Sequence, residues 1–134
     1  MKKLIIAIGL LLCGGLVKAQ TVKSTTGTTR FTVSSDGVIK DRLSNTVAYI
    51  KSNGTIENAK YTNIGYIRDE QIEDANYSTI GYVKKDGTIQ DRNYSIIGYI
   101  KKDGTVQDRN HSNLGSATGI KKEWAALIFF FFDF

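Results

Sequence analysis

The sequence has few of the residues on which disulfide frameworks depend. Among its 134 residues there is one cysteine, Cys13, and it lies inside an apolar N-terminal run. No disulfide can therefore form within the chain that follows it. Export would permit disulfides, so an exported form of this chain must be held together by packing alone.

A catalytic set is also missing. The single histidine, His111, stands where related segments of the chain have tyrosine, which indicates a structural substitution rather than a catalytic base. No serine lies in a G-x-S-x-G motif, and no cysteine nucleophile follows Cys13. We therefore predict a protein that is not an enzyme and that needs no cofactor.

Two acidic segments resemble part of a calcium-binding loop. Asp86–Asp91 and Asp103–Asp108 read D-G-T-[IV]-Q-D, like the middle of an EF-hand. That loop needs oxygen ligands two and four residues before its central aspartate. Lys84 and Tyr82 hold those places in the first copy, and a cation and a phenol are poor calcium ligands. We predict hairpin turns here and no metal site.

The first nineteen residues have the features of a secretory signal peptide. Lys2 and Lys3 precede an apolar run that ends at Val17, and Ala19 offers a small residue before cleavage. A lipoprotein signal at Cys13 is the alternative, but a leucine precedes that cysteine where a small residue is needed. We expect a signal peptide at residues 1–19 and an exported protein that is periplasmic, outer-membrane-associated or secreted.

Much of the net charge belongs to that leader. The whole chain carries 18 basic and 13 acidic residues, for a net charge of +5. Loss of Lys2, Lys3 and Lys18 leaves 15 basic residues and a net charge of +2. The remaining charges of both signs are interleaved along the sequence, which argues against a nucleic-acid partner.

A unit of seventeen residues recurs five times in the rest of the chain. Gly81 to Ile97 reads GYVKKDGTIQDRNYSII, and Gly98 to Leu114 reads GYIKKDGTVQDRNHSNL. Such a period indicates one small supersecondary unit copied around an axis or along a line. Each unit has a tight turn between two β-type segments, which is typical of a hairpin. The turns are Asp36-Gly37, Asn53-Gly54, Asp69-Glu70, Asp86-Gly87 and Asp103-Gly104.

The third unit, with Asp69-Glu70, is one residue shorter than the others, so we expect the least regular hairpin there. A small residue recurs at one phase of the repeat. Such a residue indicates either a close approach of the backbone or a twist that only glycine permits. Five units with no further copies favour a closed ring over an open stack. The small residues are Ala48, Gly65, Gly81, Gly98 and Gly115.

The repeat ends after Gly115, and an apolar segment follows. Nine apolar residues in a row, from Trp124 to Phe132, are too few to span a bilayer as a helix and too apolar to lie exposed. The segment can plug the ring, contact a membrane or partner through Trp124 to Phe134, or serve as an export address; we favour the plug. The expected regions are thus residues 1–19, 20–115 and 116–134.

The repeat and the tail together resemble the exported Bacteroidota proteins called 5-fold beta-flower proteins. The pattern I-G-Y-[IV]-K-K-D-G-T-[IV]-Q-D-R-N is clearest from Ile80 to Asn110, and Lys122-Glu123-Trp124 followed by phenylalanines adds to it. The resemblance implies an all-β fold: a closed ring of five β-hairpins about a pseudo-fivefold axis, with the apolar C-terminal segment packed against it. It implies no established activity and transfers no catalytic residue.

The candidate binding residues lie in the polar links between units. Around a ring they would place hydrogen-bonding groups beside aromatic side chains, an arrangement that suits a sugar. Alternatively, the aspartates and asparagines cap turns and each arginine pairs with an aspartate. We predict an exported module that binds a glycan or envelope protein through a repeated face; the alternative is an envelope component anchored by its Phe-rich C-terminus. The candidates are Asp91, Arg92, Asn93, Tyr94, Asp108, Arg109 and Asn110.

Overall fold

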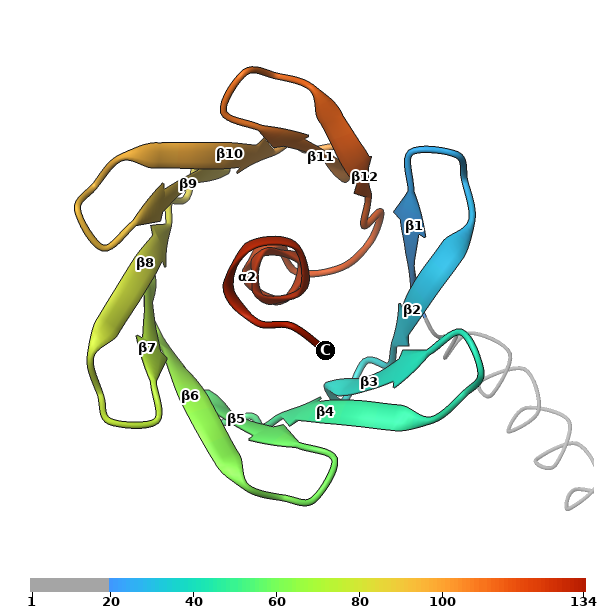
Figure 1. Cartoon of the computed structure of the whole chain (residues 1–134), viewed down its shortest axis with the longest axis vertical. Coiled ribbons are helices and arrows are strands. Elements are labelled where there is room, and N and C mark those ends of the chain that lie inside the picture. Colours follow the sequence, from blue (N-terminus) through green and yellow to red (C-terminus); the bar gives the residue numbers. More distant parts are fainter. Residues whose placement is uncertain (1–19) are drawn as a thin grey trace, which may run out of the picture.

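Twelve strands join in one closed antiparallel ring (Figure 1). The structure is a computed structural model that describes residues 20–134, and the expected signal peptide at residues 1–19 lies outside them. Each strand pairs with its neighbours in the chain, and β1 closes the ring on β12. The strands are β1 (Gln20–Ser24), β2 (Thr29–Val33), β3 (Val38–Asp41), β4 (Thr46–Ile50), β5 (Thr55–Asn58), β6 (Asn63–Arg68), β7 (Gln71–Asp74), β8 (Thr79–Val83), β9 (Thr88–Asp91), β10 (Ile96–Ile100), β11 (Thr105–Asp108) and β12 (Asn113–Ser116).

The expected all-β closed ring is confirmed, and each of the five predicted turns joins two paired strands: β2–β3, β4–β5, β6–β7, β8–β9 and β10–β11. Each odd-numbered strand and the next even-numbered strand also pair, and we call such a pair a petal. Because β1 and β12 complete the ring, it has six petals rather than the five units expected. The additional pairing is that of β1 with β12, in which Lys23 lies opposite Ser116. An unpaired strand edge exposes backbone groups, and this closure satisfies them.

The connections between strands alternate between two ends of the ring, because the chain reverses direction after every strand. We call one end the turn end: it holds the tight turns at residues 34–37, 51–54, 69–70, 84–87 and 101–104. The other end holds the loops that join the two strands of each petal, which we call the petal loops. The least regular hairpin was expected at the third turn, but the β6–β7 ladder runs without a register shift from Gly65–Asp74 to Arg68–Gln71. The Glu70 carbonyl there accepts a hydrogen bond from Val83 N–H at 2.7 Å, as that of Gly87 does from Ile100 N–H at 2.8 Å.

The interior of the ring is lined by one β-branched side chain from each odd-numbered strand. Alternate residues of a strand point to opposite faces, so a single inward position per short strand suffices. Each of these side chains is 0% exposed, and each contributes about 1.5–3 kcal/mol of hydrophobic stabilisation. They are Val22, Ile39, Ile56, Ile72, Ile89 and Val106.

The C-terminal segment runs inside the ring (Figure 1). It consists of the short helix α2 (Lys122–Ala126) and a π-helical turn, η1 (Leu127–Phe131). Ala125, Ala126 and Leu127 are 0% exposed. Within residues 20–134 no helix has the length and apolarity that a membrane crossing requires.

Four consecutive phenylalanines of this segment meet four petals, one each. A β-carbon placed on the glycine of each petal would lie within about 3 Å of a phenylalanine ring. The backbone φ of Gly65, Gly81 and Gly98 is not in the left-handed region, so these positions require glycine for space. The pairs are Gly115–Phe129, Gly98–Phe130, Gly81–Phe131 and Gly65–Phe132.

The Glu70 carboxylate links two turns and should make stability depend on pH. Lys84 Nζ donates to Glu70 Oε1 at 3.3 Å, and the Lys85 N–H donates to Oε2 at 2.9 Å. These contacts, the Lys84 bond first, hold the pKa of Glu70 below its ordinary 4.5. A lowered folded-state pKa gives stability that is present above pH 4.5 and is lost as the pH falls through the folded pKa.

We therefore expect the Glu70→Gln variant to lose less stability on acidification than the parent protein. The measurement is the urea unfolding midpoint at a series of pH values from about pH 6 down to about pH 3. Parallel curves for the two proteins would show that Glu70 contributes nothing to the acid dependence.

Candidate functional site

The predicted aspartates lie in the petal loops, where they hold the loop backbone. Asp91 Oδ1 accepts hydrogen bonds from the N–H groups of Asn93 at 2.8 Å and Ser95 at 3.0 Å. Asp108 Oδ1 does the same for the loop that contains Asn110, at 2.8 Å and 3.0 Å. The loops that begin at Asp41, Asn58 and Asp74 repeat this arrangement. These side chains therefore cap turns, as the alternative interpretation of the sequence holds.

The predicted arginines are exposed beside the capped turns. Arg92 and Arg109 each follow a capping aspartate in a petal loop, and both are exposed. The ion pairs among residues 20–134 include neither of them, so the expected Arg–Asp pairing is not formed there. Both guanidinium groups are available to a ligand, and their role in binding stays a prediction.

Sequence reasoning missed a set of stacked aromatic pairs that join neighbouring petals. Each pair has one tyrosine from an even-numbered strand and one aromatic residue from the petal loop that follows. The signal was present in the sequence, since the partners lie eleven or twelve residues apart in every case. The centroid distances are 4.9 Å for Tyr49–Tyr61, 4.5 Å for Tyr66–Tyr77, 4.7 Å for Tyr82–Tyr94 and 4.4 Å for Tyr99–His111, with interplanar angles of 10–15°. We call these four pairs the aromatic belt.

Hydrogen bonds between hydroxyl groups reinforce two of the pairs. The Tyr49 and Tyr61 hydroxyls are 3.2 Å apart, and those of Tyr82 and Tyr94 are 3.1 Å apart. Each contact favours the neutral phenol, so it raises the pKa of Tyr49 and of Tyr82 above the ordinary 10.0. The hydroxyl groups of Tyr49 and Tyr82 can therefore both donate and accept hydrogen bonds.

The loop member of each pair is held in a strained backbone conformation. Tyr61, Tyr77, Tyr94 and His111 have φ values of 64–67°, the left-handed region that costs a residue with a β-carbon about 1–2 kcal/mol. Stacking returns about 0.5–1.5 kcal/mol, which roughly offsets that cost. Even so, Tyr61 is 67% exposed and Tyr94 is 66% exposed. Each thus presents most of its surface to solvent while one face is covered by its partner.

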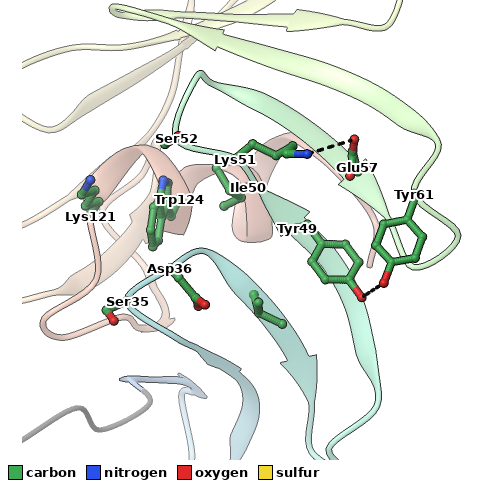
Figure 2. Close-up of a pocket in the computed structure, with 11 residues that line it drawn as sticks. Ser35, Asp36, Tyr49, Ile50, Lys51, Ser52, Glu57, Tyr61, Lys121 and Trp124 are labelled. Atoms are coloured by element: carbon green, nitrogen blue, oxygen red, sulfur yellow. Dashed lines mark hydrogen bonds and ion pairs between the residues drawn. The ribbon is translucent and has the colours of Figure 1, made fainter.

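One pair forms the wall of a groove at the edge of the turn end (Figure 2). The groove has a volume of about 540 Å³ and lies between the β2–β3 turn and the β4–β5 turn. Trp124 of α2 lines it at one side, and the Tyr49–Tyr61 pair lines it at the other (Figure 2). We call it the tyrosine–tryptophan groove.

Charged and hydroxyl groups surround these aromatic walls. Lys51 Nζ lies 3.9 Å from Glu57 Oε2, and Asp36 enters from the opposite turn (Figure 2). Lys121 Nζ lies 4.9 Å from the centre of the Trp124 ring, a cation–π contact that orients the indole. Within residues 20–134, no three side chains of the metal-binding types come together. The groove therefore offers stacking surfaces and hydrogen-bonding groups.

A closed ring of two-stranded β petals with its own C-terminal helix inside defines a β-flower repeat protein. The chain belongs to the 5-fold beta-flower protein family, whose model matches residues 19–133. This confirms the resemblance carried by the repeat and the Phe-rich tail. Comparison with curated proteins and with solved structures finds no match.

Proposed function

We propose that this protein is an exported, non-enzymatic module that binds a glycan through the aromatic belt, with the tyrosine–tryptophan groove as its principal site. The observation that carries the proposal is the exposed loop aromatic side chain of each pair. Glycine or asparagine would fit the left-handed position of these loops with less strain. Tyrosine at three of the positions, more than half exposed, is therefore what a surface for stacking a sugar requires.

The chemistry of the groove suits a saccharide of one or two rings. Its volume of about 540 Å³ lies within the range of about 300–1,000 Å³ that small-ligand sites occupy. The C–H face of a sugar can stack on Tyr61 or Trp124, which present apolar surface beside a polar tip. Asp36, Lys51 and Glu57 supply charge-assisted hydrogen bonds to hydroxyl groups.

The arginines of the petal loops extend this proposal to other petals. Arg92 precedes Tyr94 by two residues, and Arg109 precedes His111 by two. A guanidinium group beside a stacked ring can make bidentate contacts with a carboxylate or with adjacent hydroxyls. A longer glycan would then contact several petals, and each weak contact would add to the whole affinity.

The alternative function, an envelope component anchored by its Phe-rich C-terminus, has less support. Phe129 to Phe132 are partly buried and pack against the core of the ring. Anchoring would require those side chains to leave the glycines that they face. A binding module that keeps this segment inside the ring needs no such change.

Replacement of Tyr61 by alanine tests the principal site. We expect the Tyr61→Ala variant to bind a glycan selected on a glycan array at least about fivefold more weakly than the parent protein, because stacking contributes about 1 kcal/mol or more. Titration calorimetry with that glycan gives the affinities. The matched control is Tyr94→Ala, which removes an equivalent stacked residue from another petal. A larger loss for Tyr61→Ala supports the groove, and an unchanged affinity for Tyr61→Ala contradicts it.

A further inference from the structure

The fold gathers lysines that are dispersed in the sequence. The repeat places a Lys-Lys pair just before two of its Asp-Gly turns, at Lys84-Lys85 and Lys101-Lys102. In the sequence these pairs alternate with acidic residues. Ring closure brings both turns to the turn end, and the C-terminal segment begins at the same end with Lys121-Lys122. Lysines that are far apart in the sequence therefore lie close together on this surface, which makes it more positive than the sequence suggests.

Four of these lysines line one pocket. It has a volume of about 430 Å³ and lies between the β8–β9 turn, the β10–β11 turn and the segment that leads into α2. The lysines come from three separate segments, whereas Asp86 is the single acidic residue in the lining. The lining thus has a net charge of +3, with four ammonium groups against one carboxylate. The basic residues are Lys85, Lys101, Lys102 and Lys122.

Little of this charge is neutralised within the described residues. Among residues 20–134, Lys122 lies 4.0 Å from Glu123 Oε2, and the remaining ion pairs include none of the other three lysines of the pocket. Asp86 Oδ1 accepts a hydrogen bond from the Thr88 N–H at 3.0 Å, which lowers the pKa of Asp86 below its ordinary 3.8. The lowered pKa keeps this carboxylate ionised, and the net charge of +3 for the lining already includes it.

Ammonium groups held around one pocket repel each other, and a multivalent anion removes that repulsion. Opposite unit charges at about 4 Å attract by about 1–4 kcal/mol between fully aqueous and protein-surface conditions. The N–H groups of Gly87 and Gly104 bond to the carbonyls of Lys84 and Lys101 within their turns, so the lysine side chains are what attracts an oxyanion here.

We infer that this pocket, which we call the lysine pocket, binds the phosphate or sulfate groups of an acidic polysaccharide. The site differs from the tyrosine–tryptophan groove, since the two share no lining residue. It does not rest on the proposed glycan stacking. Lysine binds an oxyanion as a point charge, without a fixed geometry. We therefore expect affinity to depend on the density of negative charge along the ligand and little on the identity of its sugars.

Binding of heparin, a sulfated polysaccharide used as the probe, tests the inference. We expect the Lys101→Ala/Lys102→Ala double variant to bind heparin at least about tenfold more weakly than the parent protein at about 50 mM salt, with a shallower dependence on salt. The matched control is Lys40→Ala/Lys60→Ala, which removes the same charge from β3 and a petal loop. Circular dichroism verifies that both variants are folded.

The outcomes separate the lysine pocket from a general effect of charge. A loss confined to the Lys101/Lys102 variant supports the pocket, whereas equal losses in both variants, or no loss in either, overturn it. Inorganic phosphate and vesicles with anionic lipids serve as further probes in the same titrations. Weaker binding of both than of heparin supports a polysaccharide ligand, and tighter binding of either overturns that assignment.

Discussion

Deletion of residues 122–134 is expected to abolish cooperative unfolding of the ring. The segment supplies Ala125, Ala126 and Leu127, each 0% exposed, together with the phenylalanines that pack on the core. Their burial is worth on the order of 10 kcal/mol, at about 1.5–3 kcal/mol for each large side chain. That is comparable with the whole stability of a domain, about 5–15 kcal/mol.

Thermal unfolding followed by circular dichroism measures this effect. The deletion variant should show a broad, non-cooperative change, while an Asp133→Ala variant, altered at an exposed residue of the same segment, should unfold like the parent. A sharp transition of the deletion variant near the parental temperature would mean that the ring does not depend on the segment.

Substitution of Gly98 by valine should destabilise the protein by about 3 kcal/mol or more. A β-carbon at this position would lie 2.5 Å from Cε1 of Phe130 and 2.6 Å from the carbonyl oxygen of Gln107. A phenylalanine ring can move aside, but the carbonyl belongs to the paired strand β11 and cannot. The loss of stability therefore has two sources: displacement of the C-terminal segment and strain in the β10–β11 pairing.

Urea unfolding gives the free energy for this variant. Ile96→Val is the control, because Ile96 lies on the same strand and is 41% exposed, so a change within about 0.5 kcal/mol is expected. A Gly98→Val variant as stable as that control would show that the space next to Gly98 is open.

The turns and strands were predictable because local residues specify them. An Asp-Gly or Asn-Gly pair fixes a tight turn by itself, and alternation along short segments fixes which side chains point inward. The pairing that closes the ring was not predictable in this way. β1 reads Gln-Thr-Val-Lys-Ser, without the Gly-Tyr motif or a turn signal, and its partner β12 lies about ninety residues away along the chain.

The crowding at the repeated glycines was predictable, but the identity of the group that crowds them was not. A small residue at one phase indicates a close neighbour without naming it. The neighbours are four consecutive phenylalanines, and their glycines lie up to 67 residues earlier, as for Gly65 and Phe132. Only the closed ring, which directs every petal to one axis, brings them together.

The candidate site was predicted in part. The petal loops were recognised as the polar face of the repeat. However, the carboxylates of Asp91 and Asp108 accept hydrogen bonds from their own loops and so cap the turns. The aromatic belt was missed because each pair joins two different petals. The pattern within a single repeat unit does not predict contacts between units. The lysine pocket was hidden for a similar reason, since its charges converge from three segments.

A double-mutant cycle between Gly98 and Phe130 tests most directly that the ring is built around its own C-terminal segment. Urea unfolding of Gly98→Ala, of Phe130→Ala and of the double variant gives the coupling energy. If the ring of Phe130 faces Gly98, the alanine at position 98 costs at least about 1 kcal/mol less when Phe130 is absent. Additive effects, within about 0.5 kcal/mol, would contradict the account, because they would place Phe130 away from the petal that it is seen to fill.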